Sequence, residues 1–170
     1  MNTSVERHRR GAEGRKAKCA VLTISDSRTA ENDTSGDLLR DRLESAGHQL
    51  VARRWVRDEP EEIGAVLTGW LADRAAEVIV TTGGTGVSRR DSTIEVVDRL
   101  LDKRLEGFGE LFRMLSYAEV GSAAMMSRAV AGLSGEALLF ALPGSPAAVQ
   151  LALDKLVMPE LPHLLFERQR

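Results

Sequence analysis

The sequence contains very little cysteine or histidine. Cys19 is the only cysteine among 170 residues, and His8, His48 and His163 are scattered along the chain. A single cysteine excludes an intrachain disulfide, and these few side chains lack the spacing of a Cys/His metal cluster. Any metal ion that this chain binds would therefore have oxygen ligands.

Long apolar runs and an excess of positive charge are missing as well. Residues 137–142 form the longest apolar stretch near the C-terminus, whereas a membrane span requires ~20 residues, and no signal sequence opens the chain. The formal net charge is −2, which gives no general attraction to nucleic acid or to anionic membranes. We expect a cytoplasmic protein that binds neither nucleic acid nor a membrane.

Apolar residues are plentiful, at 43 % of the chain, which suffices for a domain with a buried core. Residues 1–16 differ from the rest because their charged side chains are mostly basic and their apolar residues show no periodicity. We interpret residues 1–16 as a flexible basic arm and residues 17–170 as a single domain.

Short β-rich runs alternate with helical patterns from Lys18 onward. The β-rich runs at residues 20–24, 51–56, 78–80 and 138–142 predict strands. Apolar residues at helical spacing form four further sets: Leu39, Leu43 and Ala46; Ile63, Val66, Leu67, Trp70 and Leu71; Phe108, Leu111, Phe112 and Leu115; Val149, Ala152, Leu153 and Leu156. This alternation predicts a three-layer α/β/α domain around a mostly parallel sheet.

One part of the sheet is expected to be antiparallel. Residues 128–133 are followed by Ser134-Gly135, which is typical of a tight turn, and then by the run at 138–142. Two β-rich runs joined by so short a turn predict a hairpin.

Prolines and acidic residues mark the expected helix ends. Pro60 fits the first turn of a helix, where its missing N–H is not needed, and Asp58 or Glu59 can cap that helix. The last predicted helix should end before Pro159, because proline disfavours helical geometry in the residue that precedes it.

Three of the predicted strands end in loops rich in glycine, serine, threonine and aspartate. These loops comprise residues 25–28, 81–86 and 143–146. In an open parallel sheet, ligands bind outside the carboxyl ends of the strands, so the three loops are expected to meet at one site. The stretch Gly83-Gly84-Thr85-Gly86 lets backbone N–H groups surround an anion, which suits phosphate.

The residues after the glycine-rich loop add charge. Arg89 and Arg90 can hold phosphate oxygens, while Asp91 can hold a divalent cation beside the anion. Ser92 and Glu95 form a capping-box pattern, so Glu95 fits a helix cap as well as it fits a binding site. The dinucleotide pattern G-x-G-x-x-G fails because Arg89 replaces its third glycine, and no Lys-Ser/Thr pair completes a P-loop.

The loop Pro143-Gly144-Ser145-Pro146 has the residue pattern of a strand-to-helix turn. Ser145 fits the N-cap and Pro146 the first helical position. The same geometry turns the next N–H groups outward as an anion site, so the structural and functional interpretations coincide. A hydrolase nucleophile at Ser145 is disfavoured because the Gly-x-Ser-x-Gly pattern is absent.

These motifs together resemble the MoaB/MogA family of molybdenum cofactor biosynthesis, from about Lys18 to Val157. The resemblance rests on Ile24-Ser25-Asp26, residues 81–86, Arg90-Asp91 with Thr93 and Glu95, residues 107–116, residues 127–132, and Leu142-Pro143-Gly144-Ser145. Residues 107–116 and 127–132 look more like MoaB than MogA.

The resemblance implies a three-layer α/β fold and an adenylyltransferase that acts on molybdopterin with ATP and Mg²⁺. It implies that Asp58 and Asp91 are the functional, metal-holding aspartates and that Ser116 contacts the pterin. The further residues expected to bind substrate or nucleotide are Ser25, Asp26, Thr82, Gly83, Gly84, Thr85, Gly86, Arg90, Thr93, Glu95, Pro143, Gly144 and Ser145. It also implies a homo-oligomer, a hexamer or else a trimer, and other proteins of the cofactor pathway as partners.

Two other functions stay open at this stage. The same pocket could hold molybdopterin as a non-catalytic carrier or assembly protein, which would bind the pterin without releasing pyrophosphate from ATP. An unrelated nucleotide-binding regulatory domain would bind ATP without the pterin. For the adenylyltransferase no general base is needed, because the terminal phosphate of molybdopterin is already anionic at pH 7, its second pKa being ~6.

Overall fold

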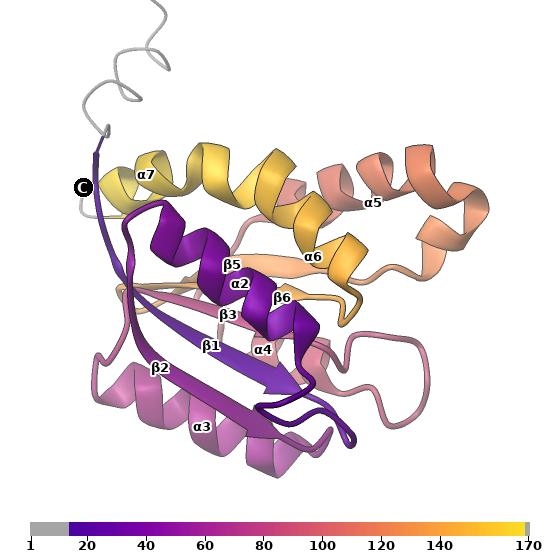
Figure 1. The fold of residues 1–170 in the computed structure, drawn as a ribbon, viewed down its shortest axis with the longest axis horizontal. Coiled ribbons are helices and arrows are strands. Elements are labelled where there is room, and N and C mark those ends of the chain that lie inside the picture. The colour runs from indigo at the N-terminus through magenta and orange to yellow at the C-terminus, as the bar shows by residue number, and fades with distance from the viewer. Residues whose placement is uncertain (1–13, 169–170) are drawn as a thin grey trace, which may run out of the picture.

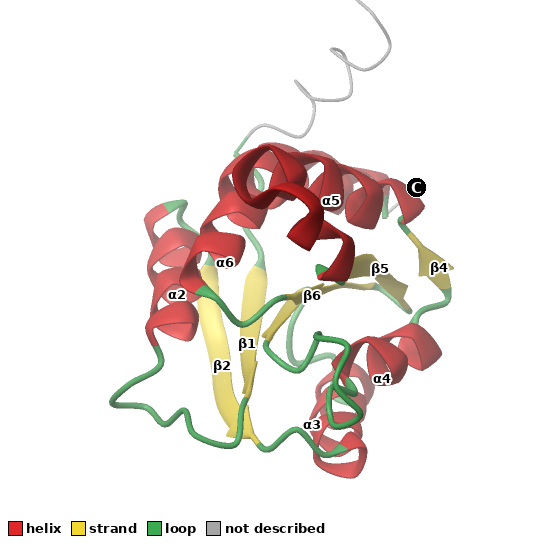
Figure 2. Ribbon diagram, turned by 90° about the vertical axis from the view of Figure 1, so that its right-hand side faces the viewer, coloured by secondary structure: helices red, strands yellow, loops and turns green. Residues whose placement is uncertain are grey.

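A six-stranded sheet runs through the middle of the molecule with helices on both faces, in the computed structural model, which describes residues 14–168 (Figure 1, Figure 2). The strand order is β2-β1-β3-β6-β5-β4. The strands are β1 (Lys18–Ile24), β2 (Gln49–Val56), β3 (Val78–Thr82), β4 (Lys103–Arg104), β5 (Val130–Ser134) and β6 (Ala137–Leu142). The predicted three-layer α/β/α fold is confirmed.

The helices divide between the two faces of the sheet (Figure 1). One face carries α2 (Thr34–Ser45), α5 (Glu106–Val120), α6 (Pro146–Ala152) and α7 (Met158–Glu167), and the other carries α3 (Pro60–Ala72) and α4 (Thr93–Leu100). Two short helical segments, η1 (Gly121–Met126) and η2 (Leu153–Val157), follow α5 and α6. No helix of residues 14–168 is long and apolar enough to cross a membrane.

The sheet is parallel except at one edge. β1 pairs in parallel with β2 and β3, and β3 pairs in parallel with β6. β5 and β6 form the predicted antiparallel hairpin, and Gly135 in its turn has a φ of +55°, a left-handed conformation that favours glycine. β4, which is only two residues long, pairs with β5 and has no apolar signal in the sequence.

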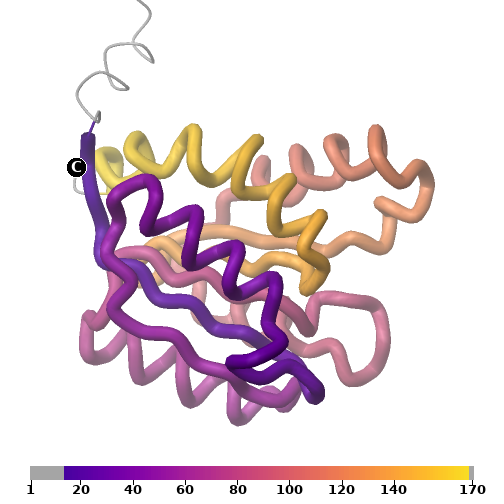
Figure 3. Tube along the Cα trace, in the orientation of Figure 1, coloured from indigo at the N-terminus to yellow at the C-terminus, as the bar shows by residue number. Residues whose placement is uncertain are grey.

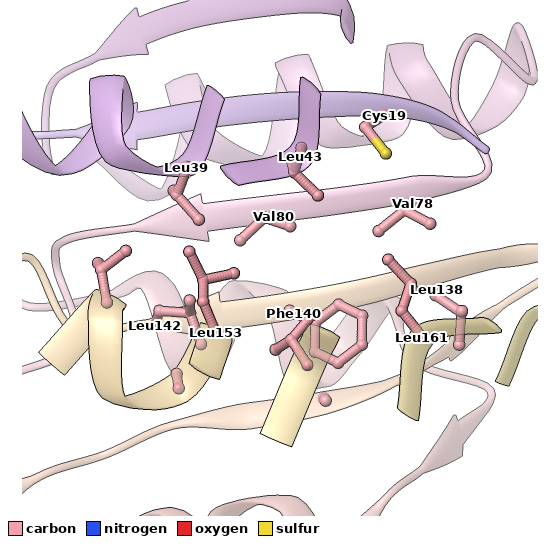
Figure 4. Packing of buried hydrophobic residues seen from close by; sticks show 14 of the residues in the cluster. Cys19, Leu39, Leu43, Val78, Val80, Leu138, Phe140, Leu142, Leu153 and Leu161 are labelled. Carbon is pink, nitrogen blue, oxygen red and sulfur yellow. The ribbon is translucent and has the colours of Figure 1, made fainter. Parts of the chain in front are cut away.

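Both faces of β1, β3 and β6 are buried, which explains their nearly continuous apolar sequences, whereas the edge strand β2 is partly exposed. Figure 4 shows Leu39 and Leu43 of α2 facing Val78 and Val80 of β3, with Phe140 nearby. A second cluster on the opposite face contains Ile63 and Leu67 of α3, Ile79 and Leu139. The helix predicted from Phe108, Leu111, Phe112 and Leu115 is confirmed as α5, in which Phe112 is fully buried and Leu111 is 46 % exposed.

The last helix does not end before Pro159, contrary to the sequence-based expectation. α6, the π-helical turn η2 and α7 follow one another directly, and Figure 3 traces one winding path through all three. The π-helical turn Leu153–Val157 has wider hydrogen-bond spacing than the α-helices before and after it. Pro159 lies in the first turn of α7, where its missing N–H has no cost. Pro162 lies inside α7.

Two predicted helix caps are also wrong. Glu59 occupies the N-cap of α3, but neither its side chain nor that of Asp58 caps the helix. Ser92 occupies the N-cap of α4 without a side-chain cap bond, and the expected capping box with Glu95 does not form. Asp58 instead accepts hydrogen bonds from Ser92, and Glu95 forms an ion pair with Arg128. Charge-assisted partners from distant parts of the chain outcompete these local caps.

The N-terminal boundary of the domain can be described from residue 14. The guanidinium of Arg15 lies 5.0 Å from the centre of the Phe166 ring, and Lys16 Nζ donates to the carbonyl of Ala46. These residues end the predicted basic arm, of which residues 1–13 lie outside the described part of the chain.

A buried carboxylate ties the first two strands to α2. Asp33 is 1 % exposed, and it accepts hydrogen bonds from Thr23 Oγ1 (2.6 Å), Gly36 N (2.9 Å) and Trp55 Nε1 (2.9 Å). Arg53 Nη2 lies 3.0 Å from Asp33 Oδ2. Burial acts to raise the pKa of Asp33, but these hydrogen bonds outweigh it and hold the pKa below the ordinary value.

We expect Asp33→Ala to lower the free energy of unfolding by about 3 kcal/mol, because it removes the buried partner of Arg53 and leaves the donors of Thr23 and Trp55 unpaired. Asp37→Ala is the matched control. Asp37 also contacts Arg53, at 2.7 Å, but is 40 % exposed, so its loss should cost about 0.5 kcal/mol. Urea denaturation measures both, and equal costs would contradict the assigned role of Asp33.

The pH dependence of stability follows from the lowered pKa of Asp33. The pKa of Asp33 is lower in the folded protein than in the unfolded chain. Asp33 therefore contributes its full stabilisation at pH values above the unfolded-state pKa. This stabilisation is lost as the pH falls through the folded-state pKa. Asp33→Ala should therefore lose more stability at pH 7 than at acid pH.

Candidate active site

The carboxyl ends of β1, β3 and β6 bring the three polar loops together. Gly83 N donates to the carbonyl of Leu142 (3.0 Å), and Thr82 Oγ1 donates to the carbonyl of Pro143 (3.0 Å). A pocket of about 410 Å³ lies between the loops. It is lined by Ile24, Ser25, Gly83, Gly84, Thr85, Gly86, Asp91, Met126, Ser127, Arg128, Pro143 and Gly144.

The loop formed by residues 83–86, here called the glycine loop, requires glycine at its start. Gly83 and Gly84 have φ values of +99° and +63°. A Cβ on Gly83 would lie 2.1 Å from the carbonyl oxygen of Ile24, and a Cβ on Gly84 would lie 2.3 Å from Thr93 Oγ1. Both the backbone conformation and the close packing therefore exclude a side chain.

Four consecutive carbonyls of the glycine loop accept hydrogen bonds from Thr93 and Arg128. Thr93 donates from Oγ1 to Gly83 (2.9 Å) and from its backbone N–H to Gly84 (3.0 Å), while Arg128 donates to Thr85 (2.9 Å) and Gly86 (2.6 Å). In a trans peptide the N–H points opposite to the C=O. The N–H groups of Gly84, Thr85 and Gly86 thus point away from these donors, and they form no hydrogen bond within residues 14–168. Such consecutive free amides form an anion-binding nest.

Several candidate hydroxyl groups hold the loops in place. Thr82 and Thr93 donate to loop carbonyls, as described above. Ser25 Oγ accepts from the backbone N–H groups of Ser27 and Arg28. Ser145 Oγ accepts from Ala148 N at 3.2 Å, which confirms Ser145 as the N-cap of α6. These side chains shape the pocket and leave the backbone amides of the glycine loop as its available donors.

Asp58 and Asp91 both pack against the glycine loop. A Cβ on Gly84 would lie 2.7 Å from Asp58 Oδ2, and a Cβ on Gly86 would lie 2.6 Å from Asp91 Oδ2. Asp58 Oδ1 accepts from the N–H (3.2 Å) and the hydroxyl (3.0 Å) of Ser92, and Asp91 Oδ2 accepts from Ser88 N (2.8 Å). Each carboxylate is therefore oriented through one oxygen, and its other oxygen has no partner within residues 14–168.

The electrostatic environment of Asp58 favours a cation. Burial raises the pKa of Asp58, the negative charges of Asp91 and Asp26 raise it further, and the hydrogen bonds from Ser92 act in the opposite direction. Residues 14–168 contain no cluster of three acidic, histidine or cysteine side chains able to hold a metal. Mg²⁺ is commonly held by one or two carboxylates together with phosphate oxygens and waters, so the pair Asp58 and Asp91 fits this ion as a phosphate-bound species.

Several candidate residues do not line the pocket, namely Asp26, Asp58, Thr82, Arg90, Thr93, Glu95, Ser116 and Ser145. Arg90 Nη2 lies 3.1 Å from carboxylate oxygens of Asp26 and of Glu59, so its guanidinium is paired with protein carboxylates. Ser116 is buried in α5, where its hydroxyl donates to the carbonyl of Phe112 (2.8 Å), and it does not line the pocket. Their roles in ligand binding stay predictions.

Arg128 is the important site residue that the motif analysis did not single out. Besides the carbonyls of Thr85 and Gly86, its guanidinium donates to the carbonyl of Asp91 (3.3 Å) and forms an ion pair with Glu95. The hydrogen bond from Arg128 lowers the pKa of Glu95. Arg128 follows η1, far along the chain from the loop that it holds, so no local pattern marks it.

Comparison with known proteins shows which family the chain resembles. The family model described as "Probable molybdopterin binding domain" matches residues 20–163. The molybdenum cofactor biosynthesis protein B of Bacillus cereus is 48 % identical over 169 residues, which are 98 % of this chain and 99 % of that protein. The chain belongs to the MoaB/MogA family.

Solved structures of relatives show the same fold. A crystal structure of a molybdenum cofactor biosynthesis protein B, 47 % identical, superposes with a TM-score of 0.88 and covers 92 % of this chain and 98 % of its own. The tungsten cofactor synthesizing protein MoaB of Pyrococcus furiosus, 37 % identical, has a TM-score of 0.83 and covers 92 % and 99 %. The resemblance inferred from the motifs, and its closer likeness to MoaB, are therefore confirmed.

We expect Arg128→Ala to release the glycine loop, with a cost of about 2 kcal/mol in unfolding free energy, because several charge-assisted hydrogen bonds are lost. Arg128→Lys keeps the charge but not the planar fork, so it should rescue the loop only partly. Hydrogen exchange of residues 83–92 measures the release. Unchanged exchange in Arg128→Ala would contradict the role of this side chain.

Proposed function

We propose that the protein transfers the adenylyl group of ATP to molybdopterin in the presence of Mg²⁺, giving adenylyl-molybdopterin and pyrophosphate in molybdenum cofactor biosynthesis. One observation carries the proposal: the free amides of the glycine loop lie beside Asp58 and Asp91, each with one unpartnered carboxylate oxygen. This combination suits a phosphate with a divalent cation. The family description names molybdopterin, and the names of the relatives refer to cofactor biosynthesis.

The absence of histidine from the pocket lining fits this reaction. The attacking group would be the terminal phosphate of molybdopterin, which is anionic at pH 7 because its second pKa is ~6. Its reaction with the α-phosphate of ATP is opposed mainly by repulsion between two anions, so the site must supply positive charge and alignment more than proton transfer.

Groups held in fixed positions by the protein supply the positive charge and the alignment. The N–H groups of Gly84, Thr85 and Gly86 donate to phosphate oxygens, and Arg128 and Thr93 keep these donors oriented before substrate binds. Asp58 and Asp91 would hold Mg²⁺ on the phosphates, each through the oxygen that Ser92 or Ser88 leaves free. Mg²⁺, when bound, supplies positive charge to the phosphate oxygens.

The test is formation of adenylyl-molybdopterin by the Asp91→Asn variant. We expect turnover to fall by about 10²-fold or more, because a carboxylate that holds the cation is lost, while binding of molybdopterin is retained. Asp41→Asn, an exposed residue of α2, is the control and should turn over as the wild type does. Unchanged turnover in Asp91→Asn would contradict the metal role.

Asp58→Asn gives a second, independent readout. Because burial and neighbouring charges raise the pKa of Asp58, its charged form is disfavoured in the fold, and a neutral isostere should raise the Tm at pH 7 while turnover falls. The amide oxygen can still accept from Ser92. Wild-type protein that binds molybdopterin but releases no pyrophosphate would instead favour the non-catalytic carrier.

We also propose that the protein is a homo-oligomer, a hexamer or else a trimer. Large apolar side chains are exposed along α5 and η1, among them Leu111, Met114, Tyr117, Val120 and Met125. Contiguous exposed apolar surface is typical of a protein interface. Light scattering should give the mass of three or six copies, and a stable monomer would contradict the proposal.

A further inference from the structure

A second pocket, of about 470 Å³, adjoins the first between the segment 87–92 and α4. Its lining includes Ser88, Arg89, Asp91, Glu95, Arg99 and Arg128. Asp91 and Arg128 line both pockets, so the Asp91 carboxylate lies at their common boundary. We call this the outer pocket, and the one at the strand ends the inner pocket.

The outer pocket contains two guanidinium groups that form no hydrogen bond. Arg89 and Arg99 are exposed, and neither side chain forms a hydrogen bond or an ion pair within residues 14–168, although the positive charge of Arg99 helps to lower the pKa of Glu95. The third guanidinium of this pocket, that of Arg128, is engaged with loop carbonyls and with Glu95. By contrast, Arg90 is paired with carboxylates. Arg89 and Arg99 are therefore the guanidinium groups of this pocket whose hydrogen-bond donors remain available to an anion.

The two pockets adjoin at Asp91 and Arg128, and an in-line displacement needs room on two sides of the phosphorus. In phosphoryl-type transfer the attacking and leaving oxygens lie on opposite sides of the phosphorus. With the α-phosphate of ATP on the glycine loop beside Asp91, one of the adjoining pockets is available to the attacking phosphate and the other to the leaving group. The inner pocket has only Asp91 and Arg128 as charged lining residues. The outer pocket adds the guanidinium groups of Arg89 and Arg99 and the carboxylate of Glu95, which is paired with Arg128, so its lining has the larger excess of positive charge.

We propose that the outer pocket binds the β- and γ-phosphates of ATP and, after reaction, pyrophosphate, through Arg89 and Arg99. This assignment rests on the proposed function. An oxygen of the molybdopterin phosphate forms a bond to the α-phosphorus, the bond from that phosphorus to the bridging oxygen breaks, and its electron pair leaves with pyrophosphate. The guanidinium groups offset the charge that gathers on the leaving oxygen and hold it by forked hydrogen bonds.

Binding of magnesium pyrophosphate to the full chain tests the proposal without turnover. Isothermal titration should show about tenfold weaker binding in Arg89→Ala and in Arg99→Ala, since loss of one charge-assisted hydrogen bond is worth about one order of magnitude. AMP lacks the β- and γ-phosphates, so its affinity should stay within about twofold of the wild-type value. Arg54→Ala, an exposed arginine of β2 that lines neither pocket, is the control and should leave both affinities unchanged.

The outcomes separate this proposal from the proposed function. Unchanged pyrophosphate binding in both variants, or AMP binding weakened as much as pyrophosphate binding, overturns the subsite. Pyrophosphate binding lost in the variants supports it, even if the wild type forms no adenylyl-molybdopterin and the proposed function fails. In an active enzyme the variants should also raise the KM for ATP and leave the KM for molybdopterin unchanged.

Discussion

The hydrogen bonds from Arg128 to the carbonyls of the glycine loop are the contact on which the site depends. They turn the carbonyls of Thr85 and Gly86 toward the guanidinium, and the planarity of the peptide then turns N–H groups the other way. Thr93 does the same for the two preceding peptides. A loop of glycines alone would sample many conformations, whereas this one presents its donors in a fixed arrangement.

Backbone and side-chain groups have different roles in the site. Hydroxyl groups such as those of Thr82 and Ser145 satisfy loop atoms, the amides of the glycine loop remain for an anion, and Asp58 and Asp91 offer one oxygen each. This arrangement has a cost to stability. The raised pKa of Asp58 shows that its charge is disfavoured in the fold, and such local strain is expected where a group must receive a cation.

Sequence patterns predicted the parts of the fold that depend on local chemistry. The strands, the hairpin turn at Gly135 and the N-cap at Ser145 follow from β-rich runs, glycine conformation and capping, and they are confirmed. The predictions failed where distant partners decide the outcome. The capping box at Ser92 is lost to Asp58 and Arg128, helix continuation at Pro159 depends on a π-helical turn, and the role of Arg128 is visible only in three dimensions.

The most direct test of the account is release of pyrophosphate from ATP by the purified protein with Mg²⁺, measured with and without molybdopterin. The account predicts release that depends on the pterin and on the metal, because the glycine loop and the two carboxylates must hold both phosphates before transfer. Binding of molybdopterin without any release of pyrophosphate would contradict it, and the same fold would then serve as a carrier.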